Sequence, residues 1–250
     1  DPANSNLLYL ASGEYTASWA HNAALLRSTD QGATWSRTDL PFKLGGNEDG
    51  RSTGERLQVD PNNGVILFLG TSQDGLWKST DRAQTWTKVT AFPASSVTFV
   101  LFDKRTGSQT GTSTLYAGVN STTGASLYRS TDGGNSWSAV SGQPTGLIPH
   151  RAGFDSNGVL YLSYSNQMGP SNITNGAVWK YTTGTGAWQL ISPVVPGYGG
   201  WDNFGYGGLA VDPQHPGTLM VATYDRWVYG RNIFRTIDGF STWNVLVGKA

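Results

Sequence analysis

The sequence predicts an all-β protein, a β-propeller with about five blades. Three observations lead to this prediction. A motif that ends in tryptophan recurs at nearly constant spacing, short apolar segments stand at matching places in each repeat, and no window sustains the hydrophobic period of a helix. Equal intervals between several copies would not be expected by chance, so the chain is built by repetition of one unit.

The recurring motif reads Ser-Thr-Asp-x-Gly-x-Thr-Trp in its first copy. The tryptophans that close successive copies are 51, 51, 51 and 55 residues apart, and the fourth copy has lost its aspartate. The five copies occupy residues 28–35, 79–86, 130–137, 181–188 and 236–243. A unit of about 50 residues that contains several strands is typical of one propeller blade.

The motif has a structural explanation. Asp and Ser or Thr side chains can bond backbone N–H groups within a turn, glycine supplies a positive φ, and tryptophan fills the space beside the turn. We therefore interpret four aspartates as parts of turns rather than as catalytic groups: Asp30, Asp81, Asp132 and Asp238. The second copy has Ala83 in place of the glycine, so strain or a different turn type is expected there.

Two further landmarks in each repeat are typical of strands. The first is a short apolar run that follows an aspartate turn, at 7–10, 66–69, 114–117, 159–162 and 218–221. The second alternates apolar and polar residues, as on a half-buried strand, at 25–28, 76–79, 127–130, 178–181 and 233–236. The prediction is a single, incomplete β-propeller domain over 1–250, with repeat units at about 1–59, 60–102, 103–154, 155–211 and 212–250.

The composition argues against several classes of partner. The 17 Lys and Arg residues balance 17 Asp and Glu residues, which argues against nucleic acid and acidic membranes as partners. No apolar run approaches the roughly 20 residues that cross a bilayer, so no membrane span is expected. The chain has no cysteine, and no pair of histidines shows a metal-ligand spacing. We therefore expect neither a metal site nor a cofactor.

Three loops are longer and richer in aromatic and polar residues than a simple turn requires, at 12–22, 165–172 and 224–232. They occupy the same place in the repeat, so they are expected to line one surface of the propeller. Aromatic rings with amides and few charges suit a neutral carbohydrate. The candidate substrate-binding residues are Tyr15, Trp19, Asn166 and Trp227. The alternative that these rings only cover blade edges remains open.

The turn motif resembles the Asp-box repeat of sialidases and related propellers, and that name is used for it here. Other stretches resemble the xyloglucanases of glycoside hydrolase family 74. They include Tyr-Thr-Ala-Ser-Trp at 15–19, Pro-Phe-Lys-Leu-Gly-Gly-Asn at 41–47 and Gly-Glu-Arg-Leu at 54–57. The resemblance covers essentially the whole chain, and the last two stretches are fairly specific because they lie outside the Asp-box.

The resemblance implies a secreted, extracellular glycoside hydrolase that cleaves the β-1,4-glucan backbone of xyloglucan with inversion. Family members are similar in having two seven-bladed propellers that face each other across a cleft, with one catalytic aspartate from each. No stretch of this sequence matches either catalytic motif, so no catalytic residue is assigned. The chain is expected to be part of the first propeller and to pack against a second propeller that it lacks. The implied partner is a polysaccharide, xyloglucan or a related β-glucan.

One substrate contact differs from the family pattern. Where family members often have a Trp-Trp pair that stacks on glucan units, this chain has Trp227 followed by Val228. Weaker or relocated binding is expected on that side.

Two other functions remain open. The chain can be a non-catalytic Asp-box propeller that binds a glycan or a protein partner. A sialidase would need an arginine cluster for the carboxylate of its substrate, and the arginines here are scattered.

Overall fold

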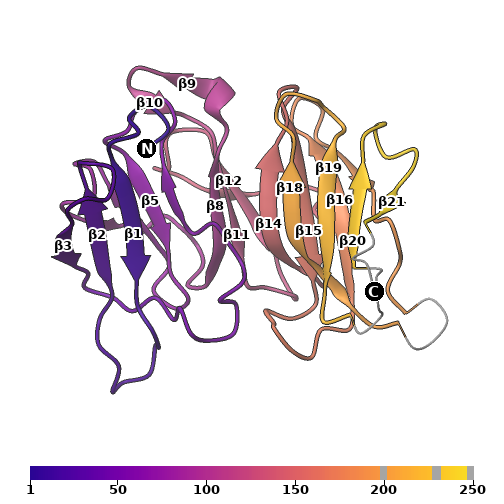
Figure 1. The fold of residues 1–250 in the computed structure, drawn as a ribbon, viewed down its shortest axis with the longest axis horizontal. Coiled ribbons are helices and arrows are strands. Elements are labelled where there is room, and N and C mark those ends of the chain that lie inside the picture. Colours follow the sequence, from indigo (N-terminus) through magenta and orange to yellow (C-terminus); the bar gives the residue numbers. More distant parts are fainter. Residues whose placement is uncertain (198–201, 227–231, 247–250) are drawn as a thin grey trace. The chain divides into compact units, whose positions relative to one another are not determined.

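The computed structural model describes three stretches of the chain (Figure 1): residues 1–197, 202–226 and 232–246. The chain divides into two compact units: 1–119 with 128–139, and 120–127 with 140–250. Strands dominate both units. The helical structure in the described residues is limited to one 3-10 turn, Lys104–Thr106. The all-β prediction is therefore confirmed.

The first unit holds most of three antiparallel sheets. The first sheet has three strands: β1 (Leu8–Ser12), β2 (Ala24–Ser28) and β3 (Ser36–Asp39). The second has four: β4 (Leu57–Val59), β5 (Leu67–Gly70), β6 (Leu76–Ser79) and β7 (Thr87–Lys88). The third is β8 (Val97–Phe102), β11 (Leu115–Val119), β12 (Leu127–Ser130) and β13 (Ser138–Ala139). A short hairpin stands between β8 and β11, formed by β9 (Gly107–Ser108) and β10 (Gly111–Thr112).

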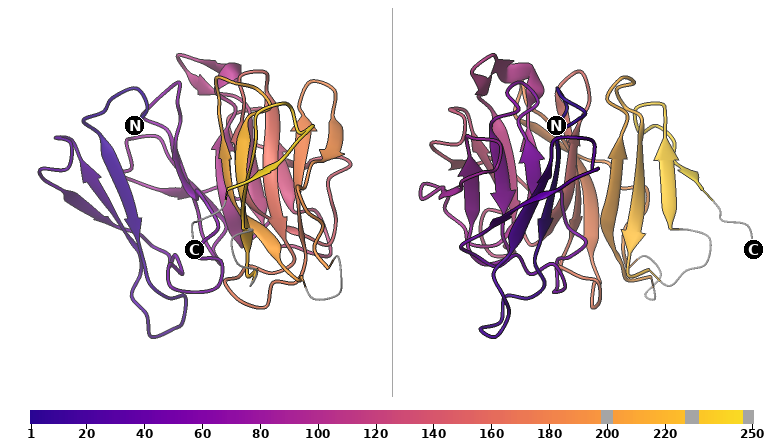
Figure 2. Two further views of the ribbon diagram at one scale, coloured as in Figure 1. Left: turned by 45° about the vertical axis from the view of Figure 1, so that its right-hand side comes forward. Right: turned by 60° about the vertical axis from the view of Figure 1, so that its left-hand side comes forward.

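The second unit contains two four-stranded antiparallel sheets, which lie against each other (Figure 2). The first is β14 (Ile148–Phe154), β15 (Val159–Ser165), β16 (Gly176–Thr182) and β17 (Ala187–Leu190). The second is β18 (Gly205–Val211), β19 (Leu219–Tyr224), β20 (Ile233–Thr236) and β21 (Asn244–Val245). In both sheets each strand pairs with the next one along the chain, which is the arrangement of a propeller blade.

Each four-stranded sheet begins one strand earlier in the chain than the repeat unit predicted from the sequence. The predicted apolar runs correspond to β1, β5, β11, β15 and β19, and the alternating segments to the strands that follow them. In four sheets a further strand precedes the apolar run: β4, β8, β14 and β18. Each of these strands lies at the end of the preceding repeat unit predicted from the sequence. A periodic sequence has no natural starting point, so only the hydrogen bonds show which strands share a sheet.

The core forms because side chains alternate across each strand. On β5, Leu67 and Leu69 face one way and join a cluster that includes Leu25. Phe68 faces the other way and joins a cluster that includes Val100. All three β5 side chains are at most 1% exposed. The second sheet is therefore covered on both faces, as a blade between two other blades must be.

The Asp-box turns are held by hydrogen bonds within each motif. In the first copy, Asp30 Oδ1 accepts from Thr34 N at 2.8 Å and Asp30 Oδ2 accepts from the Thr34 hydroxyl at 2.6 Å. Ser28 Oγ donates to the same carboxylate at 2.7 Å. These bonds, that of the Thr34 hydroxyl foremost, lower the pKa of Asp30 to about 2. The aspartate of the motif thus acts as a turn-forming residue.

The turn type is shared by all four intact copies. Two consecutive residues after each aspartate have positive φ, among them Arg82 at 59° and Ala83 at 63°. Ala83 is thus accommodated in the same turn type that glycine forms at Gly134, where φ is 87°. The left-handed conformation costs roughly 1–2 kcal/mol for a residue with a Cβ. Of the two outcomes expected at Ala83, the structure therefore shows backbone strain and not a different turn type.

Candidate functional site: an aromatic platform beside the first sheet

The loop that joins β1 to β2 carries two of the predicted sugar-binding residues. The rings of Tyr15 and Trp19 are in contact, with centroids 5.2 Å apart and planes inclined by 53°. The Trp19 side chain is 70% exposed. A large aromatic ring that is open to solvent can stack on a sugar ring. We refer to the Tyr15–Trp19 pair as the aromatic platform, and to residues 13–23 as the platform loop.

The segment 41–47 anchors the platform loop. Gly46 N donates to Gly13 O at 2.9 Å, and Asn47 N donates to the following carbonyl of the loop at 2.8 Å. The Asn47 carboxamide donates to the Tyr15 hydroxyl at 2.6 Å. A Cβ on Gly46 would lie only 2.4 Å from Gly13 O, so this approach requires glycine. The sequence singled out this segment without a role, and the structure shows that it orients Tyr15.

Lys43 adds a second anchor from the same segment. Its ammonium group donates to Ala17 O and, at 3.3 Å, to Ser18 O. The side chains on either side, Phe42 and Leu44, are 2% and 8% exposed. Their burial fixes the backbone from which Lys43 extends. The platform loop is therefore held both at its start and directly before Trp19.

A cavity of about 350 Å³ lies beside the platform loop and is lined in part by Arg51, Glu55 and Arg56. Arg56 belongs to the Gly-Glu-Arg-Leu stretch. Its guanidinium donates to Ser72 Oγ at 2.8 Å and to backbone carbonyls. Burial lowers its pKa, although not enough to remove the charge of an arginine. Arg56 thus ties together the loops that border the cavity.

Asn166, in the second unit, closes the loop between β15 and β16. Its Oδ1 accepts from Thr174 N and from Asn175 N, both at 3.0 Å, and its Nδ2 donates to the Thr174 hydroxyl at 2.8 Å. One amide hydrogen of Asn166 is not used in these bonds. The side chain is half-buried, and all the hydrogen bonds described for it lie within its own loop. The sugar contact predicted for Asn166 remains a prediction.

The β15–β16 loop touches the residues that follow β19. Ile173 N donates to Asp225 Oδ2 at 3.0 Å. The next residue, Arg226, is paired with Asp202 through Nε–Oδ1 at 2.8 Å and through a second contact between Nη2 and Oδ2. Its guanidinium lies 4.5 Å from the centroid of the Phe204 ring. Two of the three predicted loops therefore meet in this unit, and the ion pair fixes the chain directly before Trp227.

Trp227 and Val228 lie outside the described residues, so the predicted contact at Trp227 remains a prediction. The single surface shared by all three loops also remains a prediction, because the platform loop belongs to one unit and the other two loops belong to the other.

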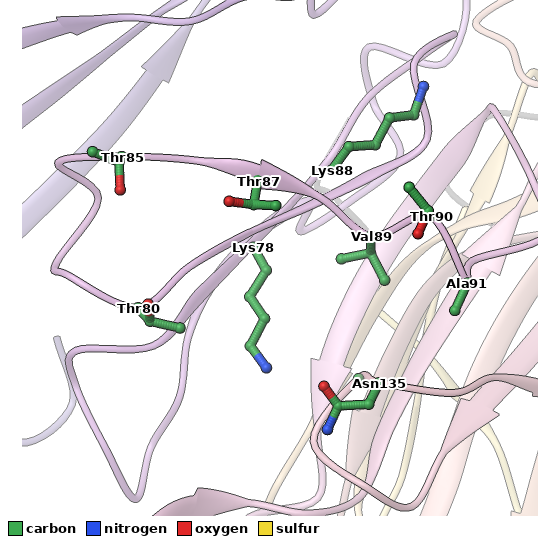
Figure 3. A pocket seen from close by; sticks show the side chains of 10 residues that line it. Lys78, Thr80, Thr85, Thr87, Lys88, Val89, Thr90, Ala91 and Asn135 are labelled. Carbon is green, nitrogen blue, oxygen red and sulfur yellow. The ribbon is translucent and has the colours of Figure 1, made fainter.

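Lys78 lines another cavity, of about 250 Å³, next to the third Asp-box. Figure 3 shows that Lys78 extends from its strand toward Asn135, whereas Lys88 points away. Lys78 Nζ donates to Gly133 O at 2.8 Å and lies 5.3 Å from the centroid of the Phe68 ring. Burial, the largest effect, lowers the pKa of Lys78. The ammonium group thus links the second sheet to the turn of the third.

The histidines and carboxylates of the described residues show no metal-binding arrangement. Within the described stretches, no group of three or more His, Asp or Glu side chains could hold a metal ion. His150 is fully buried, its Nε2 contacts Gln167 O at 2.9 Å, and burial lowers its pKa to about 4. It is therefore a neutral, structural histidine at ordinary pH. In the same stretches, no helix is long and apolar enough to cross a membrane.

The fold and the platform define the class of protein: an Asp-box β-propeller segment with an exposed aromatic residue, Trp19, on the loop between the first two strands of a sheet. No family model matches the chain. The chain is nevertheless 51% identical to a xyloglucanase of Paenibacillus sp and 46% identical to the xyloglucanase Xgh74A of Acetivibrio thermocellus, in both cases over 97% of its own length. It is 43% identical to a xyloglucanase of Hypocrea jecorina over 98% of its length.

Solved structures agree with these relatives. The crystal structure of the GH74 xyloglucanase of Xanthomonas campestris matches 98% of the chain with a TM-score of 0.92 and 44% identity. The GH74 enzyme of Niastella koreensis matches 98% of it with a TM-score of 0.86 and 38% identity. The chain is thus homologous over nearly its whole length to part of the GH74 xyloglucanases, and the β-propeller prediction is confirmed.

The match covers only part of these larger proteins. The chain spans 25% of the Paenibacillus relative and 31% of the Acetivibrio and Hypocrea relatives. It covers 37% of each of the two GH74 structures. Most of the length of each of these proteins therefore has no counterpart in the 250 residues of this chain.

Proposed function

We propose that the chain supplies propeller scaffold and glycan-binding surface to a secreted glycoside hydrolase that cleaves the β-1,4-glucan backbone of xyloglucan with inversion. Homology over 97% of the chain to proteins named xyloglucanase carries the proposal. The exposed aromatic platform supports it, because the residues that build the platform coincide with stretches that resemble the family. The substrate is a polysaccharide, and the site of action is extracellular.

In this proposal the glycan contacts are Tyr15, Trp19, Asn166 and Trp227. The three rings stack on sugar faces, and the remaining amide hydrogen of Asn166 donates to a sugar hydroxyl. Because the two ring planes are inclined by 53°, the platform is not flat, and one sugar ring cannot stack on both faces in the same orientation.

The cleavage step uses carboxyl groups that we place outside the chain. Inversion requires an acid and a base roughly 6.5–9.5 Å apart, with room for a water between them. The resemblance assigns one of these groups to earlier blades and the other to a second propeller that packs against this one. The chain itself contributes binding and orientation, which keep the glucan backbone in line with the acid and the base.

Binding of the chain to xyloglucan, measured by affinity electrophoresis, tests the platform. Replacing Trp19 with alanine should weaken binding by about 1–3 kcal/mol, by analogy with the loss of one base–aromatic stacking contact. Trp35→Ala is the matched control, because this tryptophan is also exposed but belongs to an Asp-box turn. Equal losses in the two variants would rule out a specific platform.

Activity tests the rest of the proposal. The longer protein that contains this segment should release oligosaccharides from xyloglucan and leave carboxymethylcellulose largely intact. Release from neither polymer, together with retained glycan binding, would favour the alternative of a non-catalytic Asp-box propeller.

A further inference from the structure

We propose that Glu48 is a positioning residue that holds the platform loop in its sugar-binding conformation. This inference rests on the proposed function, because it assigns Glu48 to the aromatic platform. Glu48 acts through Thr16, which lies directly after Tyr15 in the chain. It has no place among the sugar contacts predicted from the sequence.

Both carboxylate oxygens of Glu48 are directed at Thr16. Oε1 accepts from Thr16 N at 2.7 Å and from the Thr16 hydroxyl at 2.8 Å, and Oε2 lies 2.9 Å from the same hydroxyl. Hydrogen bonds to a charged acceptor are about twice as strong as those between neutral groups. A backbone N–H of the loop is thereby fixed by a side chain 32 residues away.

The neighbouring sheet completes the arrangement. Gln73, in the loop between β5 and β6, donates its amide Nε2 to the Thr16 hydroxyl at 2.8 Å. The hydroxyl can therefore give its single hydrogen to Glu48 while it accepts from Gln73. The residue before Gln73 is tied down as well, because Ser72 Oγ donates to Leu44 O at 2.7 Å. Thr16 is held from two loops at once.

The backbone around Glu48 is shaped to present the carboxylate. Gly45 has a φ of 65°, and a Cβ there would lie 2.7 Å from Glu48 Oε2 and 3.1 Å from Thr16 Cγ2. Only glycine leaves room for the carboxylate and the threonine together. Arg51 N donates to Glu48 O at 3.1 Å, which holds the main chain of the glutamate.

This arrangement suits an exposed platform. Trp19 is 70% exposed, so burial of its ring does little to hold the loop in place. If the loop were mobile, binding would have to order it, and ordering costs affinity. Glu48 holds Thr16, and Lys43 holds the Ala17 and Ser18 carbonyls, so the conformation that brings the two rings together exists before the sugar arrives.

The test compares Glu48→Gln with the control Asp49→Asn, which removes the same charge from the adjacent residue. Amide hydrogen exchange is measured without ligand on peptides covering residues 13–23, and xyloglucan binding is measured by affinity electrophoresis. We expect faster exchange and roughly 3- to 10-fold weaker binding for Glu48→Gln, and neither change for Asp49→Asn. Thr16→Val, which removes the hydroxyl at nearly constant volume, should reproduce the effect of Glu48→Gln.

A double variant separates positioning from a general structural effect. If Glu48 acts through the platform, adding Glu48→Gln to Trp19→Ala should weaken binding by much less than 3-fold beyond Trp19→Ala alone. Additive losses of binding free energy in the double variant would overturn the inference. Unchanged amide hydrogen exchange of residues 13–23 in Glu48→Gln would also overturn it. Faster exchange in a protein whose parent form binds no xyloglucan would overturn the sugar role and the proposed function, yet leave the Glu48–Thr16 contact as the anchor of the loop.

Discussion

The Asp-box turns and the platform loop form their shapes in opposite ways. In an Asp-box, Asp30 bonds Thr34 only four residues away, and every intact copy repeats the pattern. In the platform loop, Thr16 is held by Glu48 and Gln73, which are 32 and 57 residues away. Local contacts reproduce one geometry wherever the motif recurs. Long-range contacts make one loop unlike the others, which is how a repetitive scaffold acquires a specific site.

The largest effect should come from placing a Cβ where a turn meets its neighbouring sheet. Gly134→Ala puts a methyl group at a φ of 87° and 2.5 Å from Phe68 Cζ. We expect the free energy of unfolding to fall by about 2–5 kcal/mol, from left-handed strain and overpacking together. Chemical denaturation measures the loss.

Gly186→Ala is the control for Gly134→Ala. Gly186 has a φ of 75°, but a Cβ at this position would meet nothing within 4 Å. Only the cost of the backbone conformation, about 1–2 kcal/mol, therefore applies. Equal losses of unfolding free energy in the two variants would show that the close approach of Gly134 to Phe68 contributes nothing beyond the backbone strain.

A smaller effect is expected from the lysine that joins a turn to another sheet. Lys78→Met removes the hydrogen bond to Gly133 O while it keeps most of the apolar chain. The free energy of unfolding should fall by about 0.5–1.5 kcal/mol, and xyloglucan binding should not change.

The matched control for Lys78 is Lys88→Met. The ammonium group of Lys88 lies 4.0 Å from Asp74, and both side chains are about half exposed. Such a surface pair contributes roughly 0–1 kcal/mol. A change in glycan binding in Lys78→Met would contradict the separation between turn stability and platform function.

The smallest effect on stability per residue is expected from protonation of the Asp-box carboxylates at low pH. Hydrogen bonds from Ser and Thr hydroxyls and backbone N–H groups lower the pKa of Asp30 and Asp132 to about 2, against about 3.9 in the unfolded chain. A lowered folded pKa means that the stabilisation is fully present above about pH 4 and is lost as the pH falls through about 2.

Thermal melts of the parent and of Asp132→Asn at pH 7, 4, 3 and 2 measure this contribution. The variant should be less stable at neutral pH and should lose less stability on acidification, because it lacks one group that must take up a proton. Parallel acid profiles would show that the turn carboxylate contributes nothing that depends on its charge.

The blade structure could be predicted because it follows from short segments. The spacing of the tryptophans, the apolar runs and the turn residues were enough for the strands β5 and β6 and for the Asp-box between β6 and β7. The sequence left β4 unassigned, because three residues such as Leu57–Val59 carry too weak a pattern. It also placed the boundaries of the repeat units without knowing which strands share a sheet.

The site was only partly predictable. Tyr15 and Trp19 were found from the composition of one loop, and the structure places their rings in contact. Glu48 and Gln73 carried no local signal, because neither belongs to the repeat and neither lies near Thr16 in the chain. The stretch around Lys43 was noticed only through its resemblance to a family, and its role as an anchor became evident from its contacts.

The sequence by itself determined the features that depend on neighbours along the chain: the all-β class, the repeated blade and the turn role of residues such as Asp30. Tertiary structure decided which strands form a sheet, how Ala83 fits a turn made for glycine, and which distant side chains hold the aromatic platform. The physical reason is the range of the interactions. Turn hydrogen bonds and strand alternation act over a few residues, whereas the contacts of Thr16 exist only after two sheets have folded beside each other.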